Sequence, residues 1–250
     1  MIPLVKDSRG NHGDSSNYRG IAISPIISKI FEHVLKDVFS KHLSSSPYQF
    51  GFKKGKLTTH ALHCLKQSIN YYIDNGSRVY CSFLDASKAF DRLVHAGLFL
   101  KLMDRMLPKV FLNLLITWHD GLFCRVRWDG HFSQWFPIKA GVRQGGVLSP
   151  DLCSIYVDEL IYILQRAGVG CYISKVFAAA LFYADDMVVL SPSLKGLQTL
   201  LDLCQSYCAD WDIMLNGKKT KNMFFGKGIA PSYTSNLDSQ QIPWVNQWKY

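Results

Sequence analysis

Residues 181–190 read LFYADDMVVL, in which two adjacent carboxylates, Asp185 and Asp186, stand between apolar runs typical of buried strands. Two ionised Asp side chains beside so much apolar surface carry a large desolvation cost unless a cation compensates it. A divalent metal is one such cation, because carboxylate oxygens are the hard ligands that Mg²⁺ prefers. An ordinary hairpin turn explains the same residues as well, since Asp favours turns. The segment alone leaves both interpretations open.

A site for two metal ions needs more oxygens than one Asp pair supplies, because cations roughly 3.5–4 Å apart must share several ligands. Asp85 is the best further candidate, since it follows the apolar run of residues 79–84. A strand that ends in Asp85 can lie beside a hairpin of residues 177–190 and bring all three carboxylates to one end of a sheet. Asp91 faces an expected helix start, where capping explains it without chemistry.

The net charge of +9 belongs to the two ends of the chain. Residues 1–60 hold nine Lys and Arg against four acids, residues 215–250 hold five against one, and residues 61–214 hold 14 of each. Basic flanks around a neutral centre that contains the Asp pair favour a polyanionic substrate over a merely solvated basic surface.

Length and composition limit the class of protein. The chain has 250 residues, 48% of them apolar, which predicts one globular domain that can be built of lobes. The most apolar run, residues 176–184, is far too short to span a membrane, and the N-terminus lacks the pattern of a signal peptide. We therefore expect an intracellular protein that does not enter a membrane; the sequence does not distinguish nucleus from cytoplasm.

The seven cysteines form an odd, scattered set, which favours a reducing compartment over a disulfide framework. Cys204 and Cys208 have the spacing of half a zinc site, and so do His60, His63 and Cys64. Neither group has a second ligand pair, so burial in the core is the better interpretation of both.

Residue periodicity places the helices and strands. Apolar residues at three- and four-residue spacing predict helices over residues 25–38, 58–74, 108–118, 150–163 and 194–211. Ser24 is the expected cap of the first helix, and Thr58 or Thr59 of the second. Strands are expected at residues 79–84 and as hairpins within residues 124–138 and 177–190. The mixture predicts an α+β fold with a mainly antiparallel sheet, and we interpret the apolar stripes of the helices as core faces.

Two loops could meet a ligand. Residues 141–150, GVRQGGVLSP, run directly into a predicted helix. Glycines let the backbone approach a ligand closely, and a helix N-terminus favours phosphate. Residues 215–221, LNGKKTK, gather lysines at a turn. Each loop is a weak signal by itself, since Gly-rich turns and solvated basic turns are common.

Taken in order, these segments resemble the reverse transcriptases of retrotransposons without long terminal repeats, the LINE type. The resemblance covers almost the whole chain. Its segments are NYRGI at 17–21, QFGFKKGKLTTHA at 49–61, LDASKAFD at 84–91, GVRQGGVLSP at 141–150, FYADD at 182–186, LN and KT at 215–220, and WKY at 248–250. Gly20 stands where the family usually has proline, which removes no chemical group.

The resemblance implies an α+β right-hand polymerase fold, with a palm whose antiparallel sheet packs on helices and with fingers of helices and hairpins. It implies a single reverse transcriptase domain over residues 1–250. The fingers would lie mainly in residues 1–76 and 104–138, and the palm mainly in residues 77–103 and 139–250. Because the sequence stops inside the last motif, we expect the thumb to be missing, and no endonuclease, RNase H or zinc-knuckle segment is visible.

The resemblance also implies the roles of individual residues. Asp85, Asp185 and Asp186 would hold two Mg²⁺ ions, for which Mn²⁺ could substitute, with the Ala86 carbonyl as a backbone ligand. Lys219 matches a proposed general acid for the leaving pyrophosphate.

Further residues match the family's nucleotide and nucleic-acid contacts. Phe90 matches the steric gate that excludes a ribose 2′-hydroxyl, although a core role would otherwise be the better interpretation. Gln144 and Gly145, together with Arg143, would contact the incoming nucleotide and the templating base. The candidate phosphate contacts are Arg19, Lys53 and Lys54, for which a solvated surface remains an alternative.

The resemblance therefore predicts an RNA-directed DNA polymerase that transfers dNMP from dNTPs to a primer 3′-hydroxyl on an RNA template. Its partners would be the RNA template and DNA primer, with no membrane and with protein partners unknown. The alternative is a catalytically silent, retroelement-derived fragment that binds nucleic acid. Template-independent nucleotidyl transfer or cyclisation is a third possibility, against which the long basic segment before Asp85 argues.

Overall fold

The computed structural model describes residues 1–87 and 89–247 and contains two compact units. The first unit comprises Met1–Ser44 and Phe90–Tyr156, and the second comprises Ser45–Ala89 and Val157–Tyr250. Helix α6 (Ser149–Arg166) contributes its first half to the first unit and its second half to the second. Lys88 and the predicted motif of residues 248–250 lie outside the described residues.

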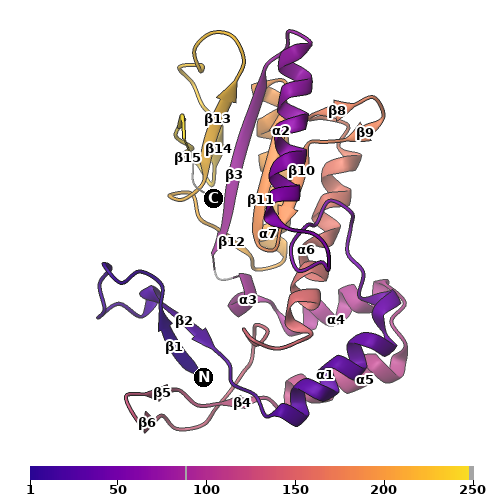
Figure 1. The fold of residues 1–250 in the computed structure, drawn as a ribbon, viewed down its shortest axis with the longest axis vertical. Coiled ribbons are helices and arrows are strands. Elements are labelled where there is room, and N and C mark those ends of the chain that lie inside the picture. The colour runs from indigo at the N-terminus through magenta and orange to yellow at the C-terminus, as the bar shows by residue number, and fades with distance from the viewer. Residues whose placement is uncertain (88, 248–250) are drawn as a thin grey trace. The chain divides into compact units, whose positions relative to one another are not determined.

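The second unit is built on a five-stranded antiparallel sheet with β3 at its centre (Figure 1). The strands are β3 (Val79–Ser87), β10 (Ala180–Tyr183), β11 (Asp186–Ser191), β12 (Met214–Leu215) and β13 (Lys221–Phe225). Strand β11 lies between β10 and β3, while β12 and β13 both pair with β3 on its other edge. Because β3 is bonded on both edges and covered on both faces, its run from residue 79 to 84 is wholly buried.

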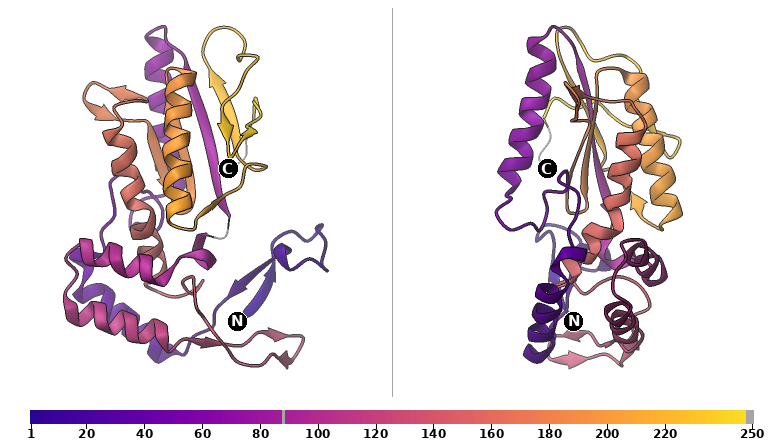
Figure 2. Two further views of the ribbon diagram at one scale, coloured as in Figure 1. Left: turned by 180° about the vertical axis from the view of Figure 1, so that it is seen from behind. Right: turned by 90° about the vertical axis from the view of Figure 1, so that its right-hand side faces the viewer.

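Helices cover both faces of this sheet. Helix α2 (Thr58–Asp74) lies on one face, and α7 (Leu194–Asp210) lies with the second half of α6 on the other (Figure 2). Two small hairpins complete the unit: β8 (Tyr172–Ile173) with β9 (Val176–Phe177), and β14 (Asn236–Leu237) with β15 (Gln240–Gln241). The sheet and its helices form the predicted α+β arrangement.

The first unit combines helices with short hairpins. The helices are α1 (Ile26–Val38), α3 (Ala89–Arg92), α4 (His95–Asp104) and α5 (Lys109–Asp120), with short 3-10 turns at Ser15–Asn17 and Ser40–His42. The strand pairs are β1 (Ile2–Val5) with β2 (Tyr18–Ile21), β4 (Phe123–Cys124) with β7 (Phe136–Pro137), and β5 (Arg127–Trp128) with β6 (His131–Phe132). Asp129 and Gly130 both have positive φ, at 45° and 79°, as the predicted two-residue hairpin turn requires.

The predicted helices are confirmed, but both expected caps are wrong. Helix α1 has Pro25 at its N-cap, with no side-chain hydrogen bond from that residue, so Ser24 lies one position too early. Helix α2 has Leu57 at its N-cap, and the Leu57 N–H donates to His60 Nδ1 at 2.9 Å. The side chain that accepts a backbone N–H at the start of α2 is therefore His60, and not Thr58 or Thr59 as expected.

The predicted core face of α1 is also wrong. Ile26, Ile30, Val34 and Val38 are each more than half exposed, whereas the buried residues of this helix are Glu32 and Leu35. Periodicity locates an apolar stripe but does not say which face finds a partner. Glu32 determines which face of α1 is buried, because it binds the side chain of an arginine and two backbone amides, which are described below.

The boundaries of the compact units differ from those expected for fingers and palm. Residues 45–76 belong to the same unit as the sheet, and residues 90–103 and 139–156 belong to the other. Compactness and polymerase subdomains are different divisions, so the assignment to fingers and palm stays a prediction. No helix of the described residues is long and apolar enough to cross a membrane.

Candidate active site

The three predicted metal-binding carboxylates all belong to the second unit, and strand register brings two of them together. Asp186, the first residue of β11, is the register partner of Asp85 on β3. Residues directly opposite on antiparallel strands project from the same face, with Cβ atoms about 4.5–5.5 Å apart. Asp185 lies in the two-residue turn between β10 and β11, because Tyr183 pairs with Asp186. The sheet thus places two carboxylates opposite each other and the third next to them in the chain.

Lys219 reaches the same place from the other edge of β3. Strand β12 pairs with β3 at Ala86, and after it the Asn216 N–H donates to the Asp85 carbonyl at 2.8 Å. The turn then folds back, since the Asn216 carbonyl accepts the backbone N–H groups of Lys219 and Thr220 at 3.1 and 2.8 Å. Lys219 Nζ lies 3.6 Å from Asp85 Oδ2, and this side chain is 64% exposed. So exposed an ion pair contributes little to stability, which leaves the ammonium available to a ligand.

The donor atoms at this end of the sheet are of the type that Mg²⁺ takes: carboxylate oxygens, partly open to solvent. As the side chains stand, residues 1–87 and 89–247 include no group of three or more His, Cys, Asp or Glu that could hold a metal ion. Asp85 instead contacts Lys219. The carboxylate oxygens of Asp85 and Asp186 are chemically suited to a divalent cation, and the role of the three carboxylates as metal ligands stays a prediction.

The predicted nucleotide-binding loop belongs to the first unit, where Arg143 is already engaged. Arg143 Nη2 donates to Glu32 Oε1 at 2.5 Å, and its guanidinium lies 5.2 Å from the ring centre of Trp118. Glu32 Oε2 accepts the backbone N–H groups of Val147 at 2.5 Å and Leu148 at 3.0 Å, just before α6. Glu32, only 2% exposed, therefore ties α1 to this loop. Glu32 was not predicted as a functional residue, because a single glutamate on an amphipathic helix gives no sign in the sequence that it is buried.

Gln144 and Gly145 follow Arg143 in the loop. Gln144 Nε2 donates to Asp91 Oδ1 at 2.9 Å, and its carbonyl accepts the Ala22 N–H at 2.8 Å. Gly145 has φ +108°, and a Cβ there would lie 3.0 Å from the Ala22 carbonyl oxygen, so glycine is required. Asp91 lies inside α3 and binds Gln144, which corrects the expectation that it caps a helix.

Phe90 lies close to the same loop. Its carbonyl accepts the Val142 N–H at 2.7 Å, and its side chain is half-buried. The backbone is tightly packed here, since a Cβ on Gly141 would lie 2.7 Å from the Phe90 carbonyl oxygen. Phe90 and the loop of residues 141–145 are thus held together by backbone contacts within the first unit.

The candidate phosphate contacts differ in their surroundings. Arg19 on β2 and Lys54 are exposed. Lys53 instead donates to the carbonyls of Ser45 and Ser46 at 2.8 and 2.6 Å, and burial lowers its pKa. Lys53 is therefore occupied in holding its own loop.

Core burial was expected of both groups that resembled half zinc sites, and for His60 and His63 this prediction is wrong, because both are exposed on α2. Cys204 and Cys208 are buried, and burial raises the pKa of the Cys208 thiol to about 12. His60 accepts a backbone N–H at the start of α2. The predicted burial of the two cysteines in the core is confirmed.

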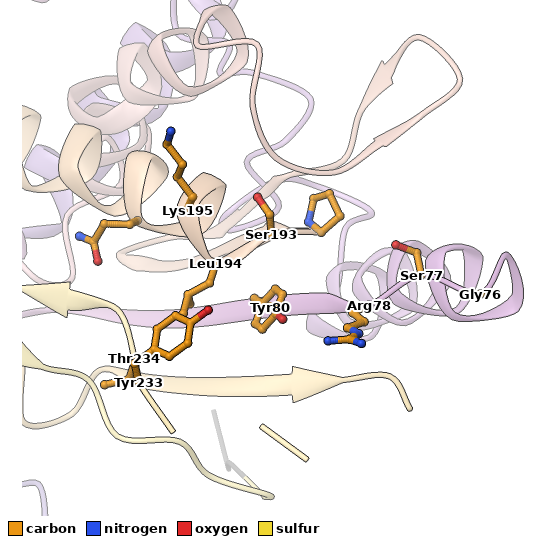
Figure 3. Close-up of a pocket in the computed structure, with 11 residues that line it drawn as sticks. Gly76, Ser77, Arg78, Tyr80, Ser193, Leu194, Lys195, Tyr233 and Thr234 are labelled. Atoms are coloured by element: carbon orange, nitrogen blue, oxygen red, sulfur yellow. The ribbon is translucent and has the colours of Figure 1, made fainter. Parts of the chain in front are cut away.

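A hollow of about 840 Å³ lies in the second unit, around the end of β3 opposite to Asp85 (Figure 3). Arg78 and Tyr80 line it from β3 and the residues before it, and Lys195 lines it from the start of α7. None of the described residues around it is a carboxylate, so it lacks the ligands of a magnesium site.

Comparison with known proteins agrees with the geometry. The family described as "Reverse transcriptase (RNA-dependent DNA polymerase)" matches residues 6–250. A probable RNA-directed DNA polymerase from transposon X-element of Drosophila melanogaster is 29% identical over all of this chain and 28% of its own length. The RNA-directed DNA polymerase from mobile element jockey of Drosophila funebris is 28% identical over 95% of this chain and 26% of its own. The chain spans about a quarter of the length of these relatives.

Solved structures support the fold. Apo telomerase from Candida tropicalis, truncated from its C-terminal domain, matches with a TM-score of 0.55 and 16% identity, over 83% of this chain and 40% of that one. Telomerase from the same organism in complex with a TWJ fragment of telomeric RNA gives 0.57 and 15%, over 84% and 35%. These likenesses confirm the predicted α+β, palm-like polymerase fold.

Proposed function

The chain belongs to the reverse transcriptase (RNA-dependent DNA polymerase) family, and from this premise we propose that it is the polymerase domain of an RNA-directed DNA polymerase. The reaction is transfer of dNMP from a dNTP to a primer 3′-hydroxyl, directed by an RNA template, with release of pyrophosphate. The observation that carries this proposal is the register of Asp85 with Asp186, next to Asp185 in the turn.

Members of this family generally use divalent metal ions. In this chain Asp85, Asp185 and Asp186 are the residues that would hold two Mg²⁺ or Mn²⁺ ions, with the Ala86 carbonyl as a further oxygen. Such ions, when bound, lower the pKa of the attacking hydroxyl and neutralise charge on the triphosphate. Lys219 stands beside Asp85 and is the cation that would donate a proton to the leaving pyrophosphate.

The loop of residues 141–145, within the first unit, carries the candidate contacts to the incoming nucleotide. Gln144, held by Asp91, and the backbone of Gly145 would contact the incoming nucleotide, and glycine is needed at 145 because a Cβ there would meet the Ala22 carbonyl. Phe90 would exclude a ribose 2′-hydroxyl. For Arg143, the ion pair with buried Glu32 favours a positioning role in the loop over direct contact with the nucleotide.

Binding of template and primer would be electrostatic to a large extent, because the chain carries a net charge of +9. Arg19 and Lys54 are exposed and suit phosphate contacts. The clustered lysines after β12, of which Lys219 is one, add a further basic edge.

The test is primer extension by the purified chain on an RNA template, with the Asp186→Asn variant beside it. We expect template-dependent DNA synthesis that the variant loses while it still binds the primed template. Binding without extension by the unaltered chain would favour a catalytically silent, nucleic-acid-binding fragment. Product that ignores the template would favour template-independent transfer.

A further inference from the structure

The turn that presents Asp185 and Asp186 has an unusual backbone. Ala184, its first central residue, has φ +61°, a value that L residues rarely adopt and that hairpin turns usually assign to glycine. Ala184 is also buried. A non-glycine residue persists in this conformation only where its surroundings determine it. The contacts that hold Ala184 in this conformation therefore determine the direction of the Asp185 and Asp186 side chains.

A single side chain binds both backbone polar groups of Ala184. Gln49 Oε1 accepts the Ala184 N–H at 2.9 Å, and Gln49 Nε2 donates to the Ala184 carbonyl at 3.2 Å. A carboxamide can do this because it carries an acceptor and a donor in one plane. Gln49 is fully buried, so water does not compete for these bonds.

The backbone around Gln49 is fixed against the same hairpin. The Phe182 N–H donates to the Tyr48 carbonyl at 2.9 Å, and the Phe50 N–H donates to the Phe182 carbonyl at 2.7 Å, which makes residues 48–50 a parallel neighbour of β10. Gly51 then passes so close that a Cβ on it would lie 2.3 Å from the Ala184 nitrogen.

This segment has its own support from the second half of α6. Asp158, 1% exposed, accepts the Ser46 N–H at 2.7 Å. Lys53 Nζ donates to the carbonyls of Ser45 and Ser46, which closes the loop that contains Gln49. A continuous set of hydrogen bonds thus runs from α6 to the Ala184 turn, entirely within the second unit.

We propose that Gln49 is a positioning residue of the polymerase site, which holds Ala184 in its left-handed conformation and thereby aims Asp185 and Asp186. Gln49 contacts no reacting atom. Its contacts with Ala184 stand independently of the proposed function, and only their effect on catalysis rests on that function. Outer partners of this kind typically change metal affinity or activity by about 10–100-fold when they are removed.

The test compares Gln49→Met with a matched control, Gln198→Met. Gln198 makes the same two-sided contact elsewhere in this unit, since its Oε1 accepts the Asn236 N–H at 2.8 Å and its Nε2 donates to the Asn236 carbonyl at 3.0 Å. We expect Gln49→Met to lower kcat for primer extension and Mn²⁺ affinity by about 10–100-fold, with the KM for primed template unchanged. Gln198→Met should leave all three values as they are.

Two further measurements keep the outcome decisive. Hydrogen exchange of the Ala184 amide should accelerate in Gln49→Met and not in Gln198→Met, whether or not the protein polymerises. Adding Ala184→Gly to Gln49→Met should recover part of the lost activity and Mn²⁺ affinity, because glycine adopts positive φ without strain. If Gln49→Met does not fold, Gln49→Glu keeps the side-chain shape but sets a carboxylate oxygen against the Ala184 carbonyl in place of the donor, and kcat and Mn²⁺ affinity should fall in that variant as well.

The proposal would be overturned if a folded Gln49→Met protein showed no change in hydrogen exchange of the Ala184 amide. It would also be overturned if Gln49→Met left kcat for primer extension unchanged in a chain that is active. If the unaltered chain fails to extend primers but Gln49→Met still weakens Mn²⁺ binding and frees the Ala184 amide, the proposed function fails and the positioning role stands.

Discussion

Asp85 and Asp186 face each other across β3 and β11 as register partners in an antiparallel ladder. A one-residue slip of β11 would move Asp186 to the opposite face of the sheet, so this register is what brings the two carboxylates together. The register is well determined, because β11 is buried along most of its length and pairs with strands on both edges.

Replacing either Asp85 or Asp186 by Asn should therefore abolish most primer extension without unfolding the protein. Removing a group that stabilises charge in the transition state commonly costs about 10²–10³-fold in rate. Adjacent carboxylates repel one another, so we expect each variant to melt at the same temperature as the unaltered chain or higher in metal-free buffer. Asp74→Asn, at an exposed acid that ends α2, is the charge-matched control and should keep full activity. Retained extension by Asp186→Asn would remove the residue from the metal site.

Phe90→Val should raise incorporation of ribonucleotides relative to deoxynucleotides, because a smaller side chain leaves room for the 2′-hydroxyl. The Phe90 carbonyl still accepts the Val142 N–H in this variant, so the loop keeps its backbone contact. The measurement is the ratio of kcat/KM for a dNTP and the matching rNTP. Phe132→Val, at an exposed aromatic on β6, is a control that should not change the ratio. An unchanged ratio in Phe90→Val would return this residue to a purely structural role.

Local patterns in the sequence predicted the parts of the fold that local chemistry determines. The hairpin of β10 and β11 follows from two apolar runs around Asp185 and Asp186, and the end of α2 follows from Asn75 and Gly76. The prediction that Asp85 lies beside that hairpin also required the resemblance to a family, because nothing in residues 79–85 indicates which strand pairs with them.

Other features depend on contacts between distant segments and could not be read from local pattern. Glu32 is buried on α1 because Arg143 and the amides before α6 bind it, whereas the apolar stripe of α1 stays exposed. Gln49 binds a turn that lies far away in the chain. A single buried Glu or Gln produces no periodic pattern in the sequence, so its role becomes clear only when the structure shows its hydrogen-bond partner.

The ion pair of Glu32 on α1 with Arg143 in the loop before α6 should contribute far more to stability than the pair of Lys36 on α1 with Asp151 on α6. Glu32→Ala leaves the guanidinium and two backbone amides without their acceptor, which for a buried pair costs about 3–5 kcal/mol of the free energy of unfolding. Lys36 and Asp151 also join α1 to α6, but the Lys36 side chain is 37% exposed, so Lys36→Ala should cost at most about 1 kcal/mol. Urea denaturation of the two variants measures both values. Equal costs would contradict the assignment of Glu32 as the residue that fixes this face of α1.

His119 should make the stability of the first unit depend on pH. Its ring is buried on α5, with Nδ1 2.8 Å from the Leu115 carbonyl and the His95 ring 4.8 Å away. Burial lowers the pKa of His119, and the nearby positive charges of His95 and Arg143 lower it further, against opposing effects of the Leu115 hydrogen bond and Asp120. The folded protein thus holds the neutral imidazole, while the unfolded chain takes up a proton near the ordinary pKa of about 6.5.

Stability from His119 is therefore fully present above about pH 6.5 and is lost as the pH falls through the folded pKa. We expect the free energy of unfolding to fall as the pH drops below about 6.5, and His119→Gln to reduce that slope, since Gln can donate to the Leu115 carbonyl but does not titrate. His131→Gln, at an exposed histidine on β6, should leave the slope unchanged. Denaturation curves at several pH values measure the slopes. A slope that His119→Gln does not reduce would show that the proton uptake occurs at another group.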